Sequence, residues 1–284
     1  MKMIHIEVPG SREATLEGYI LDCEITYGQE KCRPAVIVLP GGGYVYCSPR
    51  EGEPVALRYT ANGLHAFVLR YSVKRDAAGF RPLEEISWAI CYIREHAEQW
   101  NIDPNKIAVC GFSAGGHLAL ASGLLGENKP NAMILGYPAV QVPNVPGADY
   151  ILKILTGRQE VTDQDSADLS LAGHITKAAP PVFLMATAED YLTGYGALPV
   201  AQRYSQLGMP YELHIFQHGP HGYSTADLPA ANGSSRQINP SFAKWHDLSV
   251  EWMNRIFGEP VLEDKSVSEM GKHLKEMGIS MPGM

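Results

Sequence analysis

The sequence predicts an α/β fold, with a mostly parallel central sheet, helices on both faces of the sheet and an antiparallel hairpin at the N-terminus. Short apolar runs alternate with amphipathic stretches between Ala35 and Phe216, a pattern typical of parallel strands joined by crossover helices. The two strand-like segments before Ala35 follow one another with no helical pattern between them, as antiparallel neighbours do. We therefore expect one large sheet buried between two layers of helices.

The N-terminal part begins with two half-exposed strands, Met3–Val8 and Leu16–Thr26, in which apolar and polar residues alternate. Two apolar runs follow, Ala35–Leu39 and His65–Tyr71, and such runs are typical of strands that are covered on both faces. The stretch Glu53–Asn62 is expected to be the helix that connects them.

The next helix is expected over Pro82–Gln99, because proline lies in its first turn and apolar residues recur at helical spacing. A buried strand at Lys106–Cys110 then leads into a helix that includes His117–Ala121. Three further strands and one helix complete the pattern: Ala132–Gly136, Pro181–Thr187, the helix Pro199–Leu207 and Tyr211–Phe216.

Length and composition favour one domain over residues 1–260, followed by a C-terminal extension over 261–284. The chain has 284 residues, 45% of them hydrophobic, and no Pro/Gly/Ser-rich linker divides it. The 31 acidic and 23 basic residues leave a net charge of −8, which argues against nucleic acid or an anionic membrane as a partner.

Three features of the sequence favour the cytoplasm. The first eight residues are charged and lack the apolar run of a signal peptide. No stretch approaches the length of a membrane span. The five cysteines form an odd set without a Cys-x-x-Cys pair, as is typical of free thiols in a reducing compartment.

The extension contains a predicted amphipathic helix, Ser266–Met277. Its apolar residues recur at spacings of three and four, which places them on one narrow face: Val267, Met270, Leu274 and Met277. So short a helix needs a docking surface to stay ordered. That surface belongs either to the parent domain or to a second subunit, and the second case predicts a homodimer.

The segment Gly111–Gly116 carries the pattern Gly-x-Ser-x-Gly where a strand passes into a helix. The glycines are needed because the serine occupies a sharp, strained turn in which flanking side chains would collide with neighbouring elements. The turn exposes the hydroxyl group and aims the first amides of the helix at the atom that the serine attacks. Ser113 is therefore predicted to be a nucleophile, and the alternative is a solvated cap in a tight turn.

Other strand ends carry matching groups. Gly41, Gly42 and Gly43 follow the strand Ala35–Leu39, and their amides can contribute to an oxyanion hole, although a flexible turn is the alternative. An acid and a histidine, Asp190 and His221, follow two later strands. The order serine, acid, histidine along the chain predicts a hydrogen-bonded triad at the carboxyl ends of the strands.

These motifs together resemble those of one enzyme family. The matching segments are Pro40–Tyr44, Arg50–Ala56, the elbow from Gly111 through His117, and His214–Phe216 with His221-Gly222. Over residues 15 to 257 the chain resembles the bacterial sugar-ester esterases of the α/β-hydrolase superfamily, which are acetylxylan-esterase-like or feruloyl-esterase-like carboxylesterases.

The resemblance implies an α/β-hydrolase fold and a role for each matching residue. Ser113 is the expected nucleophile, Asp190 the orienting acid and His221 the base, while the amides of Gly42, Gly43 and Ala114 are the expected oxyanion donors. The implied reaction is hydrolysis of short-chain acyl esters through an acyl-enzyme, with acetyl groups on sugars or xylo-oligosaccharides as the substrate. No cofactor or metal is required.

Two departures from the family pattern leave questions open. Pro40 stands where many related lipases have histidine, which favours short acyl groups. Residues 191–197 intervene between the acid and a Leu-Pro-Val segment, so Glu189 remains an alternative to Asp190.

Three tyrosines are candidates for stacking on a sugar or aromatic ring: Tyr44, Tyr46 and Tyr71. The alternative is that they are packing residues.

Other chemistry is less well supported by the sequence. The spacing of His214, His218 and His221 superficially resembles a zinc site, but no Cys or acidic ligand accompanies the three histidines. The acidic cluster of Asp163, Asp165 and Asp168 is expected to be a solvated loop within residues 141–173, a long Pro/Asp-rich segment that can form a lid. An amidase or oligopeptidase and a non-catalytic binding protein on the same fold are the remaining alternatives.

Overall fold

The structure is a computed structural model that describes residues 1–23, 31–260 and 266–279. Within these residues the chain forms one eight-stranded sheet whose order is β1-β2-β4-β3-β5-β6-β7-β8. The strands are β1 (Lys2–Glu7), β2 (Thr15–Ile20), β3 (Arg33–Leu39), β4 (His65–Arg70), β5 (Ile102–Phe112), β6 (Ala132–Gly136), β7 (Val182–Thr187) and β8 (Tyr211–Phe216). β2 pairs antiparallel with β1 and β4, and all later pairs are parallel. The predicted fold class is therefore confirmed.

The parallel strands end together at one edge of the sheet. In the pairing register Leu39 of β3 lies opposite Gly111 of β5, Phe112 opposite Gly136 of β6, and Thr187 of β7 opposite Phe216. Loops that follow these residues must therefore converge over the same edge. The strands β3, β6 and β7 are buried along their whole length because helices cover both faces of the sheet.

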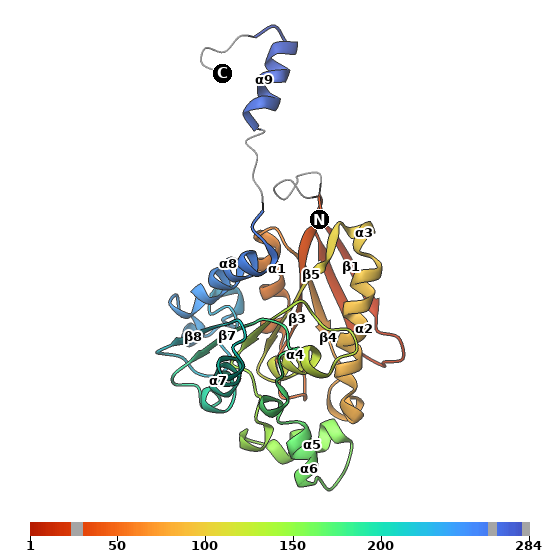
Figure 1. Ribbon diagram of the computed structural model, residues 1–284, viewed down its shortest axis with the longest axis vertical. Helices are drawn as coiled ribbons and strands as arrows, with labels where there is room; N and C mark the ends of the chain where they lie inside the picture. Colours follow the sequence, from red (N-terminus) through yellow and green to blue (C-terminus); the bar gives the residue numbers. More distant parts are fainter. Residues whose placement is uncertain (24–30, 261–265, 280–284) are drawn as a thin grey trace.

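Two helical layers enclose the sheet (Figure 1). On one face lie α1 (Glu53–Ala61) and α8 (Trp245–Phe257), and on the other lie α2 (Arg81–Glu95), α4 (Ala114–Leu125) and α7 (Ala197–Leu207). The large core includes the strand side chains and the inner faces of these helices, such as Tyr59 of α1 and Trp245 of α8, both fully buried. The short α3 (Ala97–Trp100) follows α2.

Several element boundaries differ from the prediction. The helix expected over Pro82–Gln99 is interrupted at His96, whose φ and ψ of −100° and 8° end α2 before α3 begins. β5 starts four residues before the expected Lys106, because its polar first half still pairs with β3 at Arg33. β2 ends at Ile20, and the last predicted residues of that strand, 24–26, lie outside the described residues.

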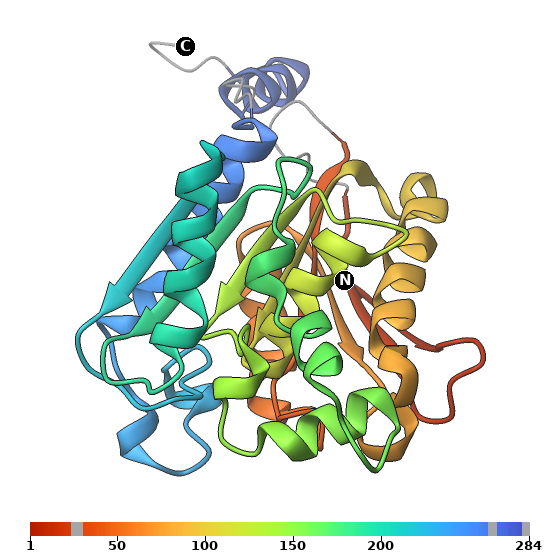
Figure 2. The same cartoon turned by 60° about the horizontal axis from the view of Figure 1, so that its bottom comes forward.

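A long excursion follows β6 and lies at the end of the sheet where the parallel strands terminate (Figure 2). It carries α5 (Ala148–Thr156) and α6 (Asp163–Asp168). It leaves and rejoins the domain at one antiparallel bridge, between Gln141 and Ser170. α5 packs on the one-turn helices at Lys74–Phe80.

The expected solvated loop at Asp163, Asp165 and Asp168 is wrong, since these residues form α6. Thr162 and Asp165 cap the helix reciprocally, each side chain accepting from the other's backbone amide. Asp165 also pairs with Arg158 at 2.7 Å. Asp163 and Asp165 lie in the first turn of α6, where the helix dipole favours negative charge, and Asp168 ends the helix.

The C-terminal extension contains α9 (Ser266–Glu276), so the helix itself is confirmed. In Figure 1 this helix stands away from the domain, and Met277 just beyond it is 66% exposed. Docking of α9 on its own domain is therefore not what the structure shows. Docking on a second subunit stays a prediction.

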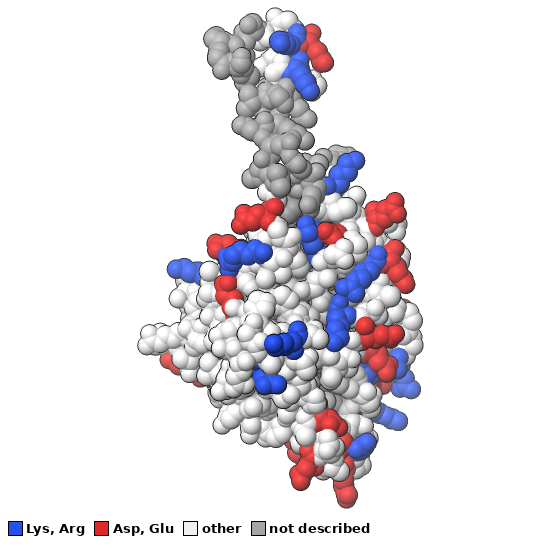
Figure 3. Space-filling model, in the orientation of Figure 1, with Lys and Arg blue, Asp and Glu red and all other residues white. Residues whose placement is uncertain are grey.

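The surface carries both signs of charge. On the face shown in Figure 3, acidic and basic side chains both occur, and a short run of adjoining basic side chains right of centre has acidic side chains beside it. Among the described helices, none combines the length and the apolar character needed to cross a bilayer.

Candidate active site

Ser113 lies at the turn between β5 and α4, and its backbone is strained. Its φ and ψ are 52° and −114°, outside the conformations that a residue with a side chain normally adopts. The turn can be this sharp because Gly115 has no side chain: a Cβ atom there would lie 2.1 Å from the Leu39 carbonyl oxygen. The hydroxyl group is thereby held above the sheet edge, at the first turn of α4.

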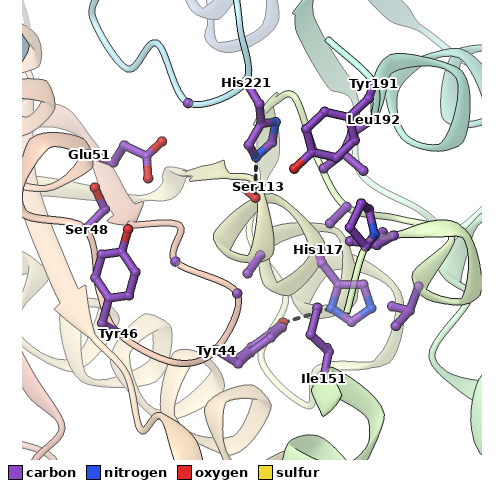
Figure 4. Close-up of a pocket in the computed structure, with 18 of the residues that line it drawn as sticks. Tyr44, Tyr46, Ser48, Glu51, Ser113, His117, Ile151, Tyr191, Leu192 and His221 are labelled. Carbon is purple, nitrogen blue, oxygen red and sulfur yellow. Dashed lines mark hydrogen bonds between the residues drawn. The ribbon is translucent and has the colours of Figure 1, made fainter. Parts of the chain in front are cut away.

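The structure brings Ser113, His221 and Asp190 together (Figure 4). His221 Nε2 lies 2.8 Å from Ser113 Oγ, and His221 Nδ1 lies 2.8 Å from Asp190 Oδ2. The buried Asp190 also accepts the Leu192 amide on Oδ1 at 2.9 Å, which fixes the plane of its carboxyl group. With Nδ1–H donating to the carboxylate, Nε2 is free to accept the serine proton.

Glu189, the alternative acid, faces a different histidine. Its Oε1 lies 2.7 Å from His218 Nδ1, and its Oε2 accepts the Gly219 amide at 2.9 Å. These contacts hold the pKa of Glu189 below its usual range. The carboxyl group is 57% exposed, so its pairing with His218 is a surface interaction.

The three histidines of the zinc alternative have separate partners. His214 pairs with Glu212 at 2.9 Å, His218 with Glu189, and His221 with Ser113 and Asp190. Within the described residues, no group of three metal-ligating side chains converges.

The glycine loop after β3 lies in the pocket wall together with Ser113. Gly42 has a φ of 127°, and a Cβ atom there would lie 2.1 Å from the Tyr46 carbonyl oxygen, so no other residue fits. The Gly42 carbonyl accepts the Val45 amide at 3.0 Å and closes the turn. In the part of the chain that is described, no hydrogen bond occupies the amides of Gly42 and Gly43, and both residues line the pocket with Ala114.

The three candidate tyrosines have different positions. Tyr46 lines the pocket and is 56% exposed. Tyr44 also lines the pocket, but it is buried and its hydroxyl group lies 2.8 Å from His117 Nδ1. Tyr71 is outside the pocket wall, where its hydroxyl group donates to the Pro40 carbonyl. Tyr71 therefore acts as a packing residue that supports the glycine loop, and not as a substrate contact.

The pocket in front of Ser113 has a volume of about 350 Å³ and two unlike sides (Figure 4). One side is polar and carries Tyr46, Ser48, Arg50 and Glu51. The other side is mostly apolar and comes largely from the excursion after β6: Ala139, Val142, Val145, Pro146, Ile151 and Leu192. The triad lies between the two sides, so a bound ester can place unlike groups on either side of its carbonyl carbon.

Three residues of the site had no role assigned from the sequence. Glu51 and His117 occur in the motifs that carry the family resemblance. Glu51 stands next to Arg50, and such a charged neighbour gives no sign that the carboxyl group is buried. Tyr191 belongs to the segment 191–197, and its ring lies 5.4 Å from the His221 ring. Burial lowers the pKa of His117 to about 4, so its imidazole is neutral and bridges Tyr44 and the Leu169 carbonyl.

Known families match much of the chain. The prolyl oligopeptidase family matches residues 85–238, more than half of the chain, and the family described as BD-FAE matches residues 21–145. Endo-1,4-beta-xylanase B of Butyrivibrio fibrisolvens is 31% identical over 217 residues, which cover 69% of this chain and 33% of that protein. Acetylxylan esterase of Xylanibacter ruminicola is 28% identical over 204 residues, covering 66% and 41%. The chain therefore spans less than half the length of either relative.

Solved structures match nearly the whole chain. MGS-M1, an α/β-hydrolase enzyme from a Medee basin deep-sea metagenome library, is 36% identical with a TM-score of 0.75, covering 90% of this chain and 98% of that one. An acetyl ester-xyloside bifunctional hydrolase from Caldicellulosiruptor lactoaceticus is 29% identical with a TM-score of 0.74, covering 92% and 97%.

The sheet order and the serine elbow thus define an α/β hydrolase. The chain belongs to the α/β hydrolases. Within them it belongs to the prolyl oligopeptidase family, which matches more than half of its residues. The expected resemblance to acetylxylan-esterase-like proteins is confirmed by these relatives.

Proposed function

We propose that this protein is a serine carboxylesterase that hydrolyses short-chain acyl esters, with acetyl groups on sugars or xylo-oligosaccharides as its substrate class. The observation that carries the proposal is the continuous series of hydrogen bonds from Asp190 through His221 to Ser113. Ser113 faces a pocket that Gly42 and Gly43 also line, and no hydrogen bond among the described residues occupies the amides of these two glycines. A serine needs such a base to be nucleophilic at neutral pH.

The proposed reaction has two steps. Ser113 Oγ attacks the ester carbonyl carbon while His221 Nε2 takes its proton, and the tetrahedral oxyanion is held by the amides of Gly42, Gly43 and Ala114. The C–O bond to the alcohol then breaks, and the alcohol leaves with the proton from His221. A water molecule, deprotonated by His221, attacks the carbonyl carbon of the acyl-enzyme. The bond from that carbon to Ser113 Oγ then breaks, Oγ takes the proton back from His221, and the carboxylic acid leaves. Asp190 holds His221 in the required tautomer throughout.

The substrate class rests on the relatives and on the polar side of the pocket. Two similar proteins are named for acetylxylan or an acetyl ester. Sugar hydroxyl groups would find Ser48 on the polar side, and the exposed rings of Tyr46 and Tyr191 flank the triad where a sugar face can stack (Figure 4).

Peptide or amide hydrolysis is the second candidate, favoured by the match to the prolyl oligopeptidase family over residues 85–238. A non-catalytic binding role is disfavoured because all three triad side chains are hydrogen-bonded in a reactive order. We also propose a cytoplasmic location, since all five cysteines are free thiols. We expect no cofactor or metal, no nucleic-acid or membrane partner, and a homodimer if α9 docks on a second subunit.

Hydrolysis of p-nitrophenyl acetate and of an acetylated xylo-oligosaccharide by the wild type and by Ser113→Ala tests the proposal. Ser113→Ala should abolish turnover with an unchanged thermal unfolding midpoint, because the hydroxyl group contributes little to the core. Full activity in a folded Ser113→Ala protein would refute the serine mechanism. A peptide anilide cleaved faster than the acetyl esters would favour the amidase alternative.

A further inference from the structure

Glu51 is a buried carboxyl group beside the triad that the proposed reaction does not use. It ends the short helix at Pro49–Glu51, is 5% exposed and lines the pocket opposite Ser113 (Figure 4). Burying a carboxyl group this deeply is costly unless strong hydrogen bonds compensate. Each of its oxygens has such a partner, and both partners belong to loops that shape the catalytic site.

The first partner is the glycine loop. Glu51 Oε2 accepts the Gly41 amide at 2.9 Å. Gly41 is pressed between this carboxyl group and the serine elbow, because a Cβ atom there would lie 2.7 Å from Glu51 Oε2 and 3.1 Å from Ser113 Cβ. The next two residues are Gly42 and Gly43, which line the pocket and whose amides are the proposed oxyanion donors. The Glu51 contact therefore sets where these amides lie relative to Ser113 Oγ.

The second partner is Tyr137, which follows β6. Its hydroxyl group donates to Glu51 Oε1 at 2.6 Å and accepts the Ser224 amide at 2.8 Å. The Tyr137 ring packs edge-on against the His221 ring, with centroids 5.0 Å apart. Because Ser224 is three residues after His221, this network holds the histidine loop from two directions.

We propose that Glu51 is a positioning residue that fixes the oxyanion amides and the His221 ring relative to Ser113. The proposal rests on the serine-esterase function, since it assigns Glu51 a task within that reaction. Its carboxyl group can accept from both loops at once, which no neutral side chain of the same size can do. Glu51 thus couples the oxyanion hole to the base.

The charge of Glu51 matters as well as its shape. Burial raises its pKa, while the hydrogen bonds from Tyr137 and Gly41 and the nearby His221 and Arg50 oppose that increase. When ionised, Glu51 also stabilises the protonated His221 that forms during acylation.

Glu51→Gln keeps the volume of the side chain but leaves one of the two donors facing an NH₂ group. We expect kcat per active site to fall by about tenfold or more with KM within about twofold, because one lost oxyanion donor costs roughly 10²–10³ in kcat. The acid limb of the kcat/KM profile should also move to lower pH, because a negative charge beside His221 is lost. Active sites are counted from the burst of p-nitrophenol. The matched control is Glu53→Gln, an exposed carboxyl group two residues away, which should leave kcat and KM unchanged.

Tyr137→Phe is the second variant, for the case that Glu51→Gln does not unfold cooperatively. It keeps the bond from Gly41 to Glu51 and removes only the link to the histidine loop, so a smaller loss of about three- to tenfold in kcat is expected. A kcat per active site within about threefold of wild type for Glu51→Gln, or a loss confined to the burst amplitude, overturns the proposal. If Glu51→Gln cannot be folded, an unchanged kcat for Tyr137→Phe overturns the proposed role of Glu51.

The Ser113→Ala variant distinguishes a failure of the serine-esterase function from a failure of the role proposed for Glu51. If wild type is active, Ser113→Ala is inactive and Glu51→Gln resembles wild type, only the role of Glu51 fails. If Ser113→Ala retains activity, the serine-esterase function fails and the role of Glu51 fails with it.

Discussion

Replacing Asp190 by asparagine tests which carboxyl group orients His221, the proposed base. In the structure Asp190 Oδ1 accepts the Leu192 amide, so the carbonyl oxygen of the introduced asparagine would take that position and its NH₂ group would face His221 Nδ1. Two donors cannot share this contact. The imidazole would change to the tautomer with its proton on Nε2, which cannot accept the proton of Ser113.

The expected loss is large. A triad with the wrong histidine tautomer loses roughly 10⁴ in kcat, which is about 5.4 kcal/mol at 1.36 kcal/mol for each factor of ten. The assay is kcat for p-nitrophenyl acetate, with the thermal unfolding midpoint measured in parallel to show that the variant is folded.

Glu189→Gln is the matched control because Glu189 is adjacent and exposed, and its hydrogen bonds among the described residues are with His218 and Gly219 and not with His221. Its kcat should stay within about threefold of wild type, as expected for a surface contact. If Glu189→Gln is the inactive variant and Asp190→Asn is mild, the assignment of the acid is wrong.

The pocket, the buried histidines and the C-terminal extension each lead to one further prediction. Acetyl esters should be cleaved faster than octanoyl esters, because the cavity of about 350 Å³ must hold both sides of the ester, and a higher kcat/KM for octanoyl would contradict this. Stability should fall as the pH decreases from about 6.5 towards 4, since burial lowers the pKa of His65, His117 and His246 to about 4. The unfolded chain binds these protons at a higher pH than the folded protein does, so each histidine should lower the free energy of unfolding by on the order of 3 kcal/mol. Urea unfolding at several pH values measures this loss. Deletion of residues 261–284 should leave the unfolding midpoint unchanged, because α9 stands off the domain, and light scattering should show a dimer becoming a monomer if α9 serves a second subunit.

Much of the sheet and of the triad could be predicted from the sequence because their signals are local. Apolar runs such as Ala35–Leu39 have few alternatives to a buried strand, and the elbow needs glycines at fixed positions. No helix is predicted from the sequence in the excursion after β6, and Pro143, Pro146 and Gly147, which precede α5, are residues typical of loops. The interruption at His96 was also missed, since no glycine or proline marks it.

The roles of Glu51 and Tyr71 could not be predicted, for a physical reason. Whether a polar side chain is buried depends on which distant segments close over it, and the partners of Glu51 come from residues 41 and 137. Tyr71 follows a strand that ends at the site, but its side chain points to the Pro40 carbonyl and not into the pocket. The spacing of residues along the sequence shows neither the burial of Glu51 nor the direction of the Tyr71 side chain.

The bridge between Gln141 and Ser170 makes the excursion after β6 an exchangeable module. Its two ends lie side by side, so a segment of another length can replace it without moving β6 or β7. The entropy of closing such a loop changes by only about 0.6 kcal/mol for each doubling of length. Since this module supplies most of the apolar side of the pocket, related enzymes can acquire new acyl or alcohol preferences by exchanging it, while the strands that hold the triad stay as they are.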